Sequence, residues 1–154
     1  MARLLLYISV GGANVMKEII LATHGHLSEE FKRTIELIVG KTNNIRCFCM
    51  TKEKAEDVGK KELEELVSQS DEDKLIVLTD LFGGSAANIC AELLMRGHHF
   101  KLITGLNLPM LLTIVTTDSD KLTVEELVEA GIRASVEGVI NVNNILSKEE
   151  KNID

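Results

Sequence analysis

Residues 75–88, LIVLTDLFGGSAAN, have the pattern of a buried β-strand followed by a tight turn and a helix. The apolar run at the start is typical of parallel strands that are covered on both faces. Asp80 is expected at the carboxyl end of this strand, the edge at which open α/β sheets bind ligands. Gly83 and Gly84 permit a tight turn, and Ser85 is a suitable N-cap for the helix that follows. Free amides at a helix start favour an anion, above all phosphate, although a turn without function is the alternative.

Expected strands and helices alternate along the rest of the chain. Apolar runs predict further strands at residues 18–23, 45–50, 100–104 and, in a short stretch, 138–142. Apolar residues at helical spacing predict helices at residues 28–39, 51–69, 86–96, 110–115 and 123–136. Gly40 is expected as a helix C-cap, Thr51 as an N-cap, and Thr123 as the start of a capping box. The alternation predicts an α/β fold with right-handed crossovers: a doubly wound, mainly parallel sheet flanked by helices.

Length and composition indicate one domain with two short additions. The chain has 154 residues, with one proline and 11 glycines, and shows no linker-like segment. We expect the domain at residues 16–146, an N-terminal extension at 1–15 and a charged tail at 147–154. The extension weakly resembles a signal peptide and could add a short strand, but its apolar run is too short to span a bilayer. The net charge of −7 argues against nucleic acid as a partner, because phosphate backbones need clustered Lys and Arg.

The cysteines and histidines predict no metal site. Cys47, Cys49 and Cys90 form an odd set without regular spacing, which fits free thiols in a reducing compartment. Cys47 and Cys49 share one strand face and are expected as small core residues rather than ligands. A metal pair of His24 and His26 lacks a third ligand at recognisable spacing. His26, His98 and His99 are expected at the surface.

His24 and Asp80 are the residues expected to perform chemistry. His24 ends the first strand and Asp80 ends the third, and these strands are commonly neighbours in a doubly wound sheet. A carboxylate that accepts one imidazole proton fixes the tautomer and leaves the second nitrogen free to attack. With the glycine turn beside them, phosphorus is a natural target for this nucleophile. The alternative is a polar residue at the strand end, satisfied by backbone groups.

Three motifs resemble those of a known family. They are THG at residues 23–25, TDLFGGSAAN at 79–88 and GLNLPMLL at 105–112. Together, over about residues 16–146, they resemble the mannose-family enzyme IIA domain of the bacterial phosphoenolpyruvate-dependent sugar phosphotransferase system. Two positions depart from the family pattern: Ala86 replaces a common proline, and Thr113 stands where an acidic residue is frequent.

The resemblance implies a phosphocarrier without metal or cofactor. The histidine of the first motif, here His24, would accept a phosphoryl group from phospho-HPr and pass it to a IIB component for sugar uptake. The resemblance gives Asp80 the orienting role and places the glycine turn beside the phosphoryl group. The residues of the implied site are Thr23, His24, Asp80, Gly83, Gly84, Ser85 and Asn88.

The resemblance also implies an assembly. The family fold has four parallel strands plus an antiparallel edge strand swapped in a homodimer, and residues 138–142 match that strand. The protein would be cytoplasmic and reach the membrane only through IIC and IID partners, which carry the sugar specificity. Two alternatives are a related phosphocarrier of dihydroxyacetone phosphorylation and a regulatory domain that uses phosphohistidine as a signal.

Overall fold

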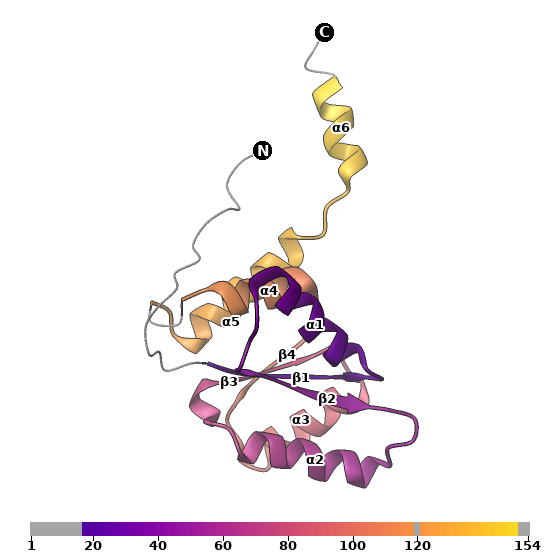
Figure 1. The fold of residues 1–154 in the computed structure, drawn as a ribbon, viewed down its shortest axis with the longest axis vertical. Coiled ribbons are helices and arrows are strands. Elements are labelled where there is room, and N and C mark those ends of the chain that lie inside the picture. The colour runs from indigo at the N-terminus through magenta and orange to yellow at the C-terminus, as the bar shows by residue number, and fades with distance from the viewer. Residues whose placement is uncertain (1–16, 119–120, 151–154) are drawn as a thin grey trace.

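A four-stranded parallel sheet forms the centre of the protein, and helices cover both faces (Figure 1). The computed structural model describes residues 17–118 and 121–150. The strand order is β2-β1-β3-β4, so the chain winds outward in both directions from β1 and β3. The strands are β1 (Glu18–His24), β2 (Ile45–Met50), β3 (Leu75–Thr79) and β4 (Lys101–Thr104). The predicted doubly wound α/β class is confirmed, and each of the three described strand pairings is parallel.

The helices follow the strands in the expected alternation. They are α1 (Leu27–Val39), α2 (Glu56–Ser68), α3 (Ser85–Met95), α4 (Leu108–Thr116), α5 (Val124–Glu137) and α6 (Val142–Glu150), with a short 3₁₀ turn at Glu72–Lys74. Helices α2 and α3 lie on one face of the sheet, and α1, α4 and α5 on the other (Figure 1).

Alternate side chains of the central strands supply two separate cores. Ile20 and Val77 contribute to the core beneath α2 and α3. Ile19 and Leu78 contribute to the core beneath α1, α4 and α5. This alternation follows from the two-residue period of a strand, and burial on both faces explains why these strands are apolar throughout. All five residues of β3 are buried, so Asp80 directly after it stands at the point where the core ends.

Two predicted helix ends are confirmed and one is wrong. Gly40 follows α1 with a positive φ of 88°, and Thr123 forms a reciprocal capping box with Glu126 at the start of α5. Thr51 does not cap α2, which begins five residues later at Glu56 after Ala55. In α2, Val58 is 51% exposed, whereas Gly59 packs against Met50 and Phe48 of β2.

The expected strand at residues 138–142 does not form in this single chain. Helix α5 ends at Glu137, and α6 begins at Val142 and extends away from the sheet (Figure 1). Val139 is 81% exposed and Ile140 58%, so this apolar segment has little packing within its own chain. A strand needs a neighbour to satisfy its backbone groups, and the segment makes no such ladder here. The charged tail is helical as far as Glu150, and the expected extension at 1–15 lies outside the described residues.

Within the described ranges, no helix combines the length and the apolar character that crossing a bilayer requires.

Candidate functional site

The carboxyl edge of β1 and β3 brings His24 and Asp80 together. The two strands are direct neighbours, with Ala22 of β1 opposite Thr79 of β3. His24 is the last residue of β1, and Asp80 follows the last residue of β3. The sequence prediction that these side chains meet is confirmed, because Nδ1 of His24 lies 3.0 and 3.1 Å from the two Asp80 carboxylate oxygens.

Asp80 is held as a carboxylate by hydrogen bonds from three groups. The backbone N–H of His24 donates to Oδ2 at 2.9 Å, and that of Leu81 donates to Oδ1 at 2.9 Å. The His24 ring provides the third contact through Nδ1. Partial burial raises the pKa of Asp80. The hydrogen bonds from His24 and the positive charge of its ring lower the pKa by more than burial raises it, so the pKa of Asp80 is below its usual value. An ionised carboxylate only accepts hydrogen bonds, so Nδ1 of His24 is assigned as the donor.

This contact leaves Nε2 of His24 as the ring nitrogen with a free lone pair. When Nδ1 carries the proton, the lone pair of a neutral imidazole is on Nε2. The His24 side chain is 45% exposed, whereas that of Asp80 is 15% exposed. The acidic partner is therefore largely enclosed, and the imidazole remains accessible to a second protein.

Gly84 forms one wall of the site. A Cβ atom at this position would lie 2.5 Å from Cε1 and 3.2 Å from Nε2 of His24. The imidazole therefore occupies the space that a side chain at position 84 would fill. Gly83 has a different role, because its φ of 77° belongs to the left-handed region that favours glycine. Nδ2 of Asn88 donates to the carbonyl of Gly83 at 3.0 Å and holds the turn in place.

The start of α3 differs from the prediction in one respect. Ser85 was expected as the N-cap, but Gly84 occupies that position and Ser85 is the first helical residue. No side chain caps this end of α3. The amide of Gly84 itself donates to the Leu81 carbonyl at 3.1 Å, so it belongs to the turn. The amides of the first turn of α3 have no acceptor inside the helix. They can therefore donate hydrogen bonds to the oxygens of an anion beside His24.

Thr23 supports the site indirectly. Its side chain is buried, and Oγ1 accepts a hydrogen bond from the Ser28 amide at 2.7 Å. Thr23 therefore fixes the start of α1 relative to the end of β1, and its hydroxyl is engaged with α1.

The sequence reasoning missed the exposed apolar residues that stand close in the chain to His24 and Asp80. Phe82 is 85% exposed, Leu81 61% and Leu27 43%. Leu81 and Phe82 stand between Asp80 and the glycine turn, and Leu27 begins α1. Apolar residues inside a turn motif are a signal that could have indicated a contact surface.

The other histidines lie apart from this pair. His98 was expected at the surface, but its side chain is only 20% exposed and its Nδ1 lies 2.7 Å from Glu72. His99 is 62% exposed and contacts both Glu72 and Asp73. His26, which is exposed as expected, lies 3.0 Å from Glu29 through its Nδ1.

Comparisons with known proteins agree on one family. A family model described as the PTS system fructose IIA component, EIIA-man, matches residues 18–132. The mannose-specific EIIAB component of the PTS system of Escherichia coli K12 is 28% identical over 122 residues, which are 79% of this chain and 38% of that protein. The sorbose-specific EIIA component of Lacticaseibacillus casei is 29% identical over 111 residues, or 72% of this chain and 80% of that protein.

A solved structure shows the same fold. The phosphotransferase system component EIIA from Streptococcus agalactiae superposes with a TM-score of 0.75 at 27% identity, covering 82% of this chain and 98% of that one. The resemblance carried by the three sequence motifs is therefore confirmed. Because the family model matches well over half of the chain, including His24 and Asp80, this protein belongs to the EIIA-man family of PTS IIA components.

Proposed function

We propose that this protein is a phosphocarrier of a sugar phosphotransferase system. His24 accepts a phosphoryl group from phospho-HPr and passes it to a IIB component. The observation that carries this proposal is the contact of His24 Nδ1 with Asp80, at 3.0 Å, beside the uncapped start of α3. The motifs around both residues lie inside the range that the family model matches.

Transfer begins with in-line attack by Nε2 of His24 on the phosphorus of the donor's phosphohistidine. A nitrogen–phosphorus bond forms on His24 as the donor's nitrogen–phosphorus bond breaks, and the bonding electrons return to the donor imidazole. His24 becomes cationic during this step, and the Asp80 carboxylate stabilises its Nδ1–H. Bonds of one kind are exchanged, so the step is close to thermoneutral and runs onward to the acceptor.

The start of α3 stabilises the transferred group. Phosphoryl transfer depends mainly on positioning and on stabilising charge on the equatorial oxygens. In this proposal, amides of the first turn of α3 and the exposed Ser85 hydroxyl donate to these oxygens. Gly84 leaves room for the imidazole, and Nδ2 of Asn88 donates to the Gly83 carbonyl at 3.0 Å, which holds the turn in place.

Leu27, Leu81 and Phe82 provide the contact surface for donor and acceptor. All three are exposed and apolar, and each is close in the chain to His24 or Asp80. Both partners must reach the same nitrogen, so both use this surface in turn. Contact with the membrane then occurs only through the permease subunits that IIB serves, and the carrier is cytoplasmic.

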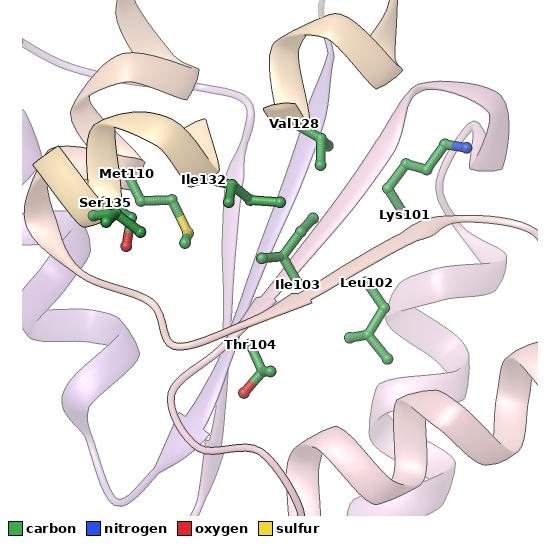
Figure 2. Close-up of a pocket in the computed structure, with 9 residues that line it drawn as sticks. Lys101, Leu102, Ile103, Thr104, Met110, Val128, Ile132 and Ser135 are labelled. Atoms are coloured by element: carbon green, nitrogen blue, oxygen red, sulfur yellow. The ribbon is translucent and has the colours of Figure 1, made fainter. Parts of the chain in front are cut away.

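We further propose a homodimer in which the C-terminal segments are exchanged. In the described sheet β4 pairs only with β3, so its outer edge offers backbone groups to another strand. A groove of about 490 Å³ runs along this edge. The exposed apolar residues Val139, Ile140 and Val142 have the composition to fill such a groove. The groove is lined by Lys101, Leu102, Ile103, Thr104, Met110, Val128, Ile132, Ser135 and Val136 (Figure 2).

Intact mass spectrometry tests the carrier role. The protein is incubated with phosphoenolpyruvate, enzyme I and HPr, and then with a candidate IIB domain. We expect one acid-labile phosphoryl group on the carrier, which disappears when IIB is added. No gain with active phospho-HPr would contradict the carrier role. Gain without onward transfer to any IIB would favour the phosphohistidine signalling domain, and transfer to a dihydroxyacetone kinase subunit would favour the related carrier.

A further inference from the structure

Three ligand-type side chains meet beside the start of α1, separately from the His24–Asp80 pair. His26 immediately precedes α1, Glu29 lies in its first turn, and Cys49 lies on β2. One ligand atom from each residue, a ring nitrogen, a carboxylate oxygen and a thiol sulfur, lies within 4.8 Å of the other two. We propose that His26, Glu29 and Cys49 bind a divalent transition-metal ion of the Zn²⁺ type.

The ligand set favours this class of ion. Zn²⁺ takes tetrahedral sets of Cys sulfur, His nitrogen and carboxylate oxygen, at bond lengths of about 2.0–2.3 Å. Such bonds place neighbouring ligand atoms about 3.5 Å apart. Nδ1 of His26 and Oε2 of Glu29 are already 3.0 Å apart, so small side-chain movements complete the site. Ca²⁺ and Mg²⁺ prefer oxygen ligands alone and are disfavoured by the imidazole and the thiol. A water molecule would complete the fourth position.

Buried hydrogen bonds fix the backbone that carries these ligands. The Ser28 amide donates to Oγ1 of Thr23 at 2.7 Å, and the Ser28 hydroxyl donates to the Phe48 carbonyl at 3.1 Å. The same hydroxyl lies 3.3 Å from Sγ of Cys49. These contacts join the first turn of α1 to β1 and β2. Two of the three ligands therefore lie on packed secondary structure, which lowers the entropic cost of binding an ion.

Binding exchanges protons for the metal. The Cys49 thiol releases its proton to solvent and binds as the thiolate. The hydrogen bond between His26 Nδ1 and Glu29 is lost, the single imidazole proton moves from Nδ1 to Nε2 by exchange with solvent, and the freed lone pair of Nδ1 binds the ion. Charge balances, because a thiolate and a carboxylate together neutralise a divalent cation. The sequence predicted no metal site because Cys49 is remote from His26 in the chain; the pairing of Thr23 with Cys49 between β1 and β2 brings them together.

Cobalt provides a direct test. Co²⁺ substitutes for Zn²⁺, and its absorption spectrum depends on which ligand atoms bind it. The reduced protein is titrated with Co²⁺ alone, and Zn²⁺ is then added. We expect a near-ultraviolet thiolate-to-cobalt charge-transfer band that Zn²⁺ abolishes. Cys49→Ser should lose the band, and the matched control Cys47→Ser should keep it. His24→Ala should also keep it, which separates the metal site from the nucleophile.

Competition with a chromophoric chelator measures the affinity for Zn²⁺. We expect Cys49→Ser, Glu29→Gln and His26→Asn each to weaken binding by at least about tenfold, with circular dichroism spectra unchanged. A charge-transfer band that persists in Cys49→Ser would overturn the proposal. So would Zn²⁺ affinities equal in wild type and all three variants, which would mean adventitious surface binding only. The test does not depend on phosphoryl transfer and stands whether or not the proposed carrier role holds.

Discussion

Two edges of the sheet differ in how many of their contacts one chain supplies: the carboxyl edge of β1 and β3, and the outer edge of β4. At the first edge, His24 contacts Asp80 through Nδ1 and packs against Gly84, and buried strands position His24 and Asp80. At the second edge, a groove borders β4, while the apolar side chains of Val139, Ile140 and Val142 are exposed. The candidate site is therefore assembled within the single chain, whereas the C-terminal segment carries apolar side chains that its own chain leaves exposed. The following predictions, four on substitutions and one on acidification, test this difference between the two edges.

Removal of the proposed nucleophile, His24, is expected to have the largest effect. His24→Ala should reduce phosphoryl acceptance from phospho-HPr by at least about 1,000-fold, because no other described histidine contacts Asp80. Rapid-quench transfer assays measure this rate. His99→Ala is the control, since His99 contacts Glu72 and Asp73 instead. Equal loss in both variants would contradict the assignment of His24.

Asp80→Asn should slow transfer by about 100-fold. The amide keeps the size of the carboxylate but loses the charge that stabilises cationic His24. The same single-turnover assay measures the effect. The matched control is Asp73→Asn, because the Asp73 side chain is 83% exposed and contacts only His99 among the described ion pairs. A rate within about twofold of wild type for Asp80→Asn would show that His24 needs no carboxylate.

Two neighbouring glycines should respond differently to alanine. Gly84→Ala places a methyl group against the His24 ring and should slow transfer by about tenfold. Gly83→Ala meets open space but strains a backbone with φ of 77°, which costs about 1 kcal/mol of folding stability. Transfer rates and melting temperatures are measured for both. Gly83→Ala should lower the melting temperature and leave the transfer rate near that of wild type, whereas Gly84→Ala should lower the transfer rate. A slow Gly83→Ala together with a Gly84→Ala of wild-type rate would contradict the geometry of the turn.

The C-terminal segment should affect assembly more than chemistry. Ile140→Asp places a charge in the segment that the proposed dimer buries, so light scattering should show a shift from dimer to monomer. Transfer by the monomer should stay within about threefold of wild type, since the site lies at another edge of the sheet. Leu37→Asp is the control, because Leu37 is 87% exposed on α1. A wild-type protein that is monomeric at all concentrations would refute the exchange.

Acidification gives the smallest effect. The folded-state pKa of Asp80 lies below its usual value, so ionised Asp80 stabilises the fold above the unfolded pKa of about 3.9. This contribution is lost as the pH falls through the lower folded-state value. Urea unfolding between neutral pH and pH 3 should therefore show a shallower loss of stability in Asp80→Asn than in wild type. Parallel curves would contradict the lowered pKa.

The site was predictable where it depends on strand ends. His24 and Asp80 each follow an apolar run, and adjacent parallel strands bring such positions to one edge. The N-cap was less predictable, because Ser85 and Gly84 are both acceptable caps and the backbone conformation chooses between them. Thr51 failed for a similar reason: it has the right chemistry for a cap, but residues 51–55 form an irregular turn before α2.

Features that depend on distant residues were not predictable. The approach of Cys49 to His26 depends on strand register and on the packing of α1, which local patterns do not encode. The predicted strand at 138–142 does not form in the single chain, because β-branched residues such as Val139 and Ile140 favour a strand only where another strand is present to pair with them. Local sequence patterns therefore predicted most helices and strands, but the contacts between residues distant in the chain depend on tertiary packing.

The position of the phosphoryl group on His24 tests the proposed chemistry most sharply. The protein is labelled with ¹⁵N-histidine, phosphorylated with phosphoenolpyruvate, enzyme I and HPr, and studied by NMR at alkaline pH. Because Asp80 holds Nδ1 at 3.0 Å, we expect phosphorylation at Nε2 of His24. Phosphorylation at Nδ1, or at another histidine, would contradict the proposed role of Asp80.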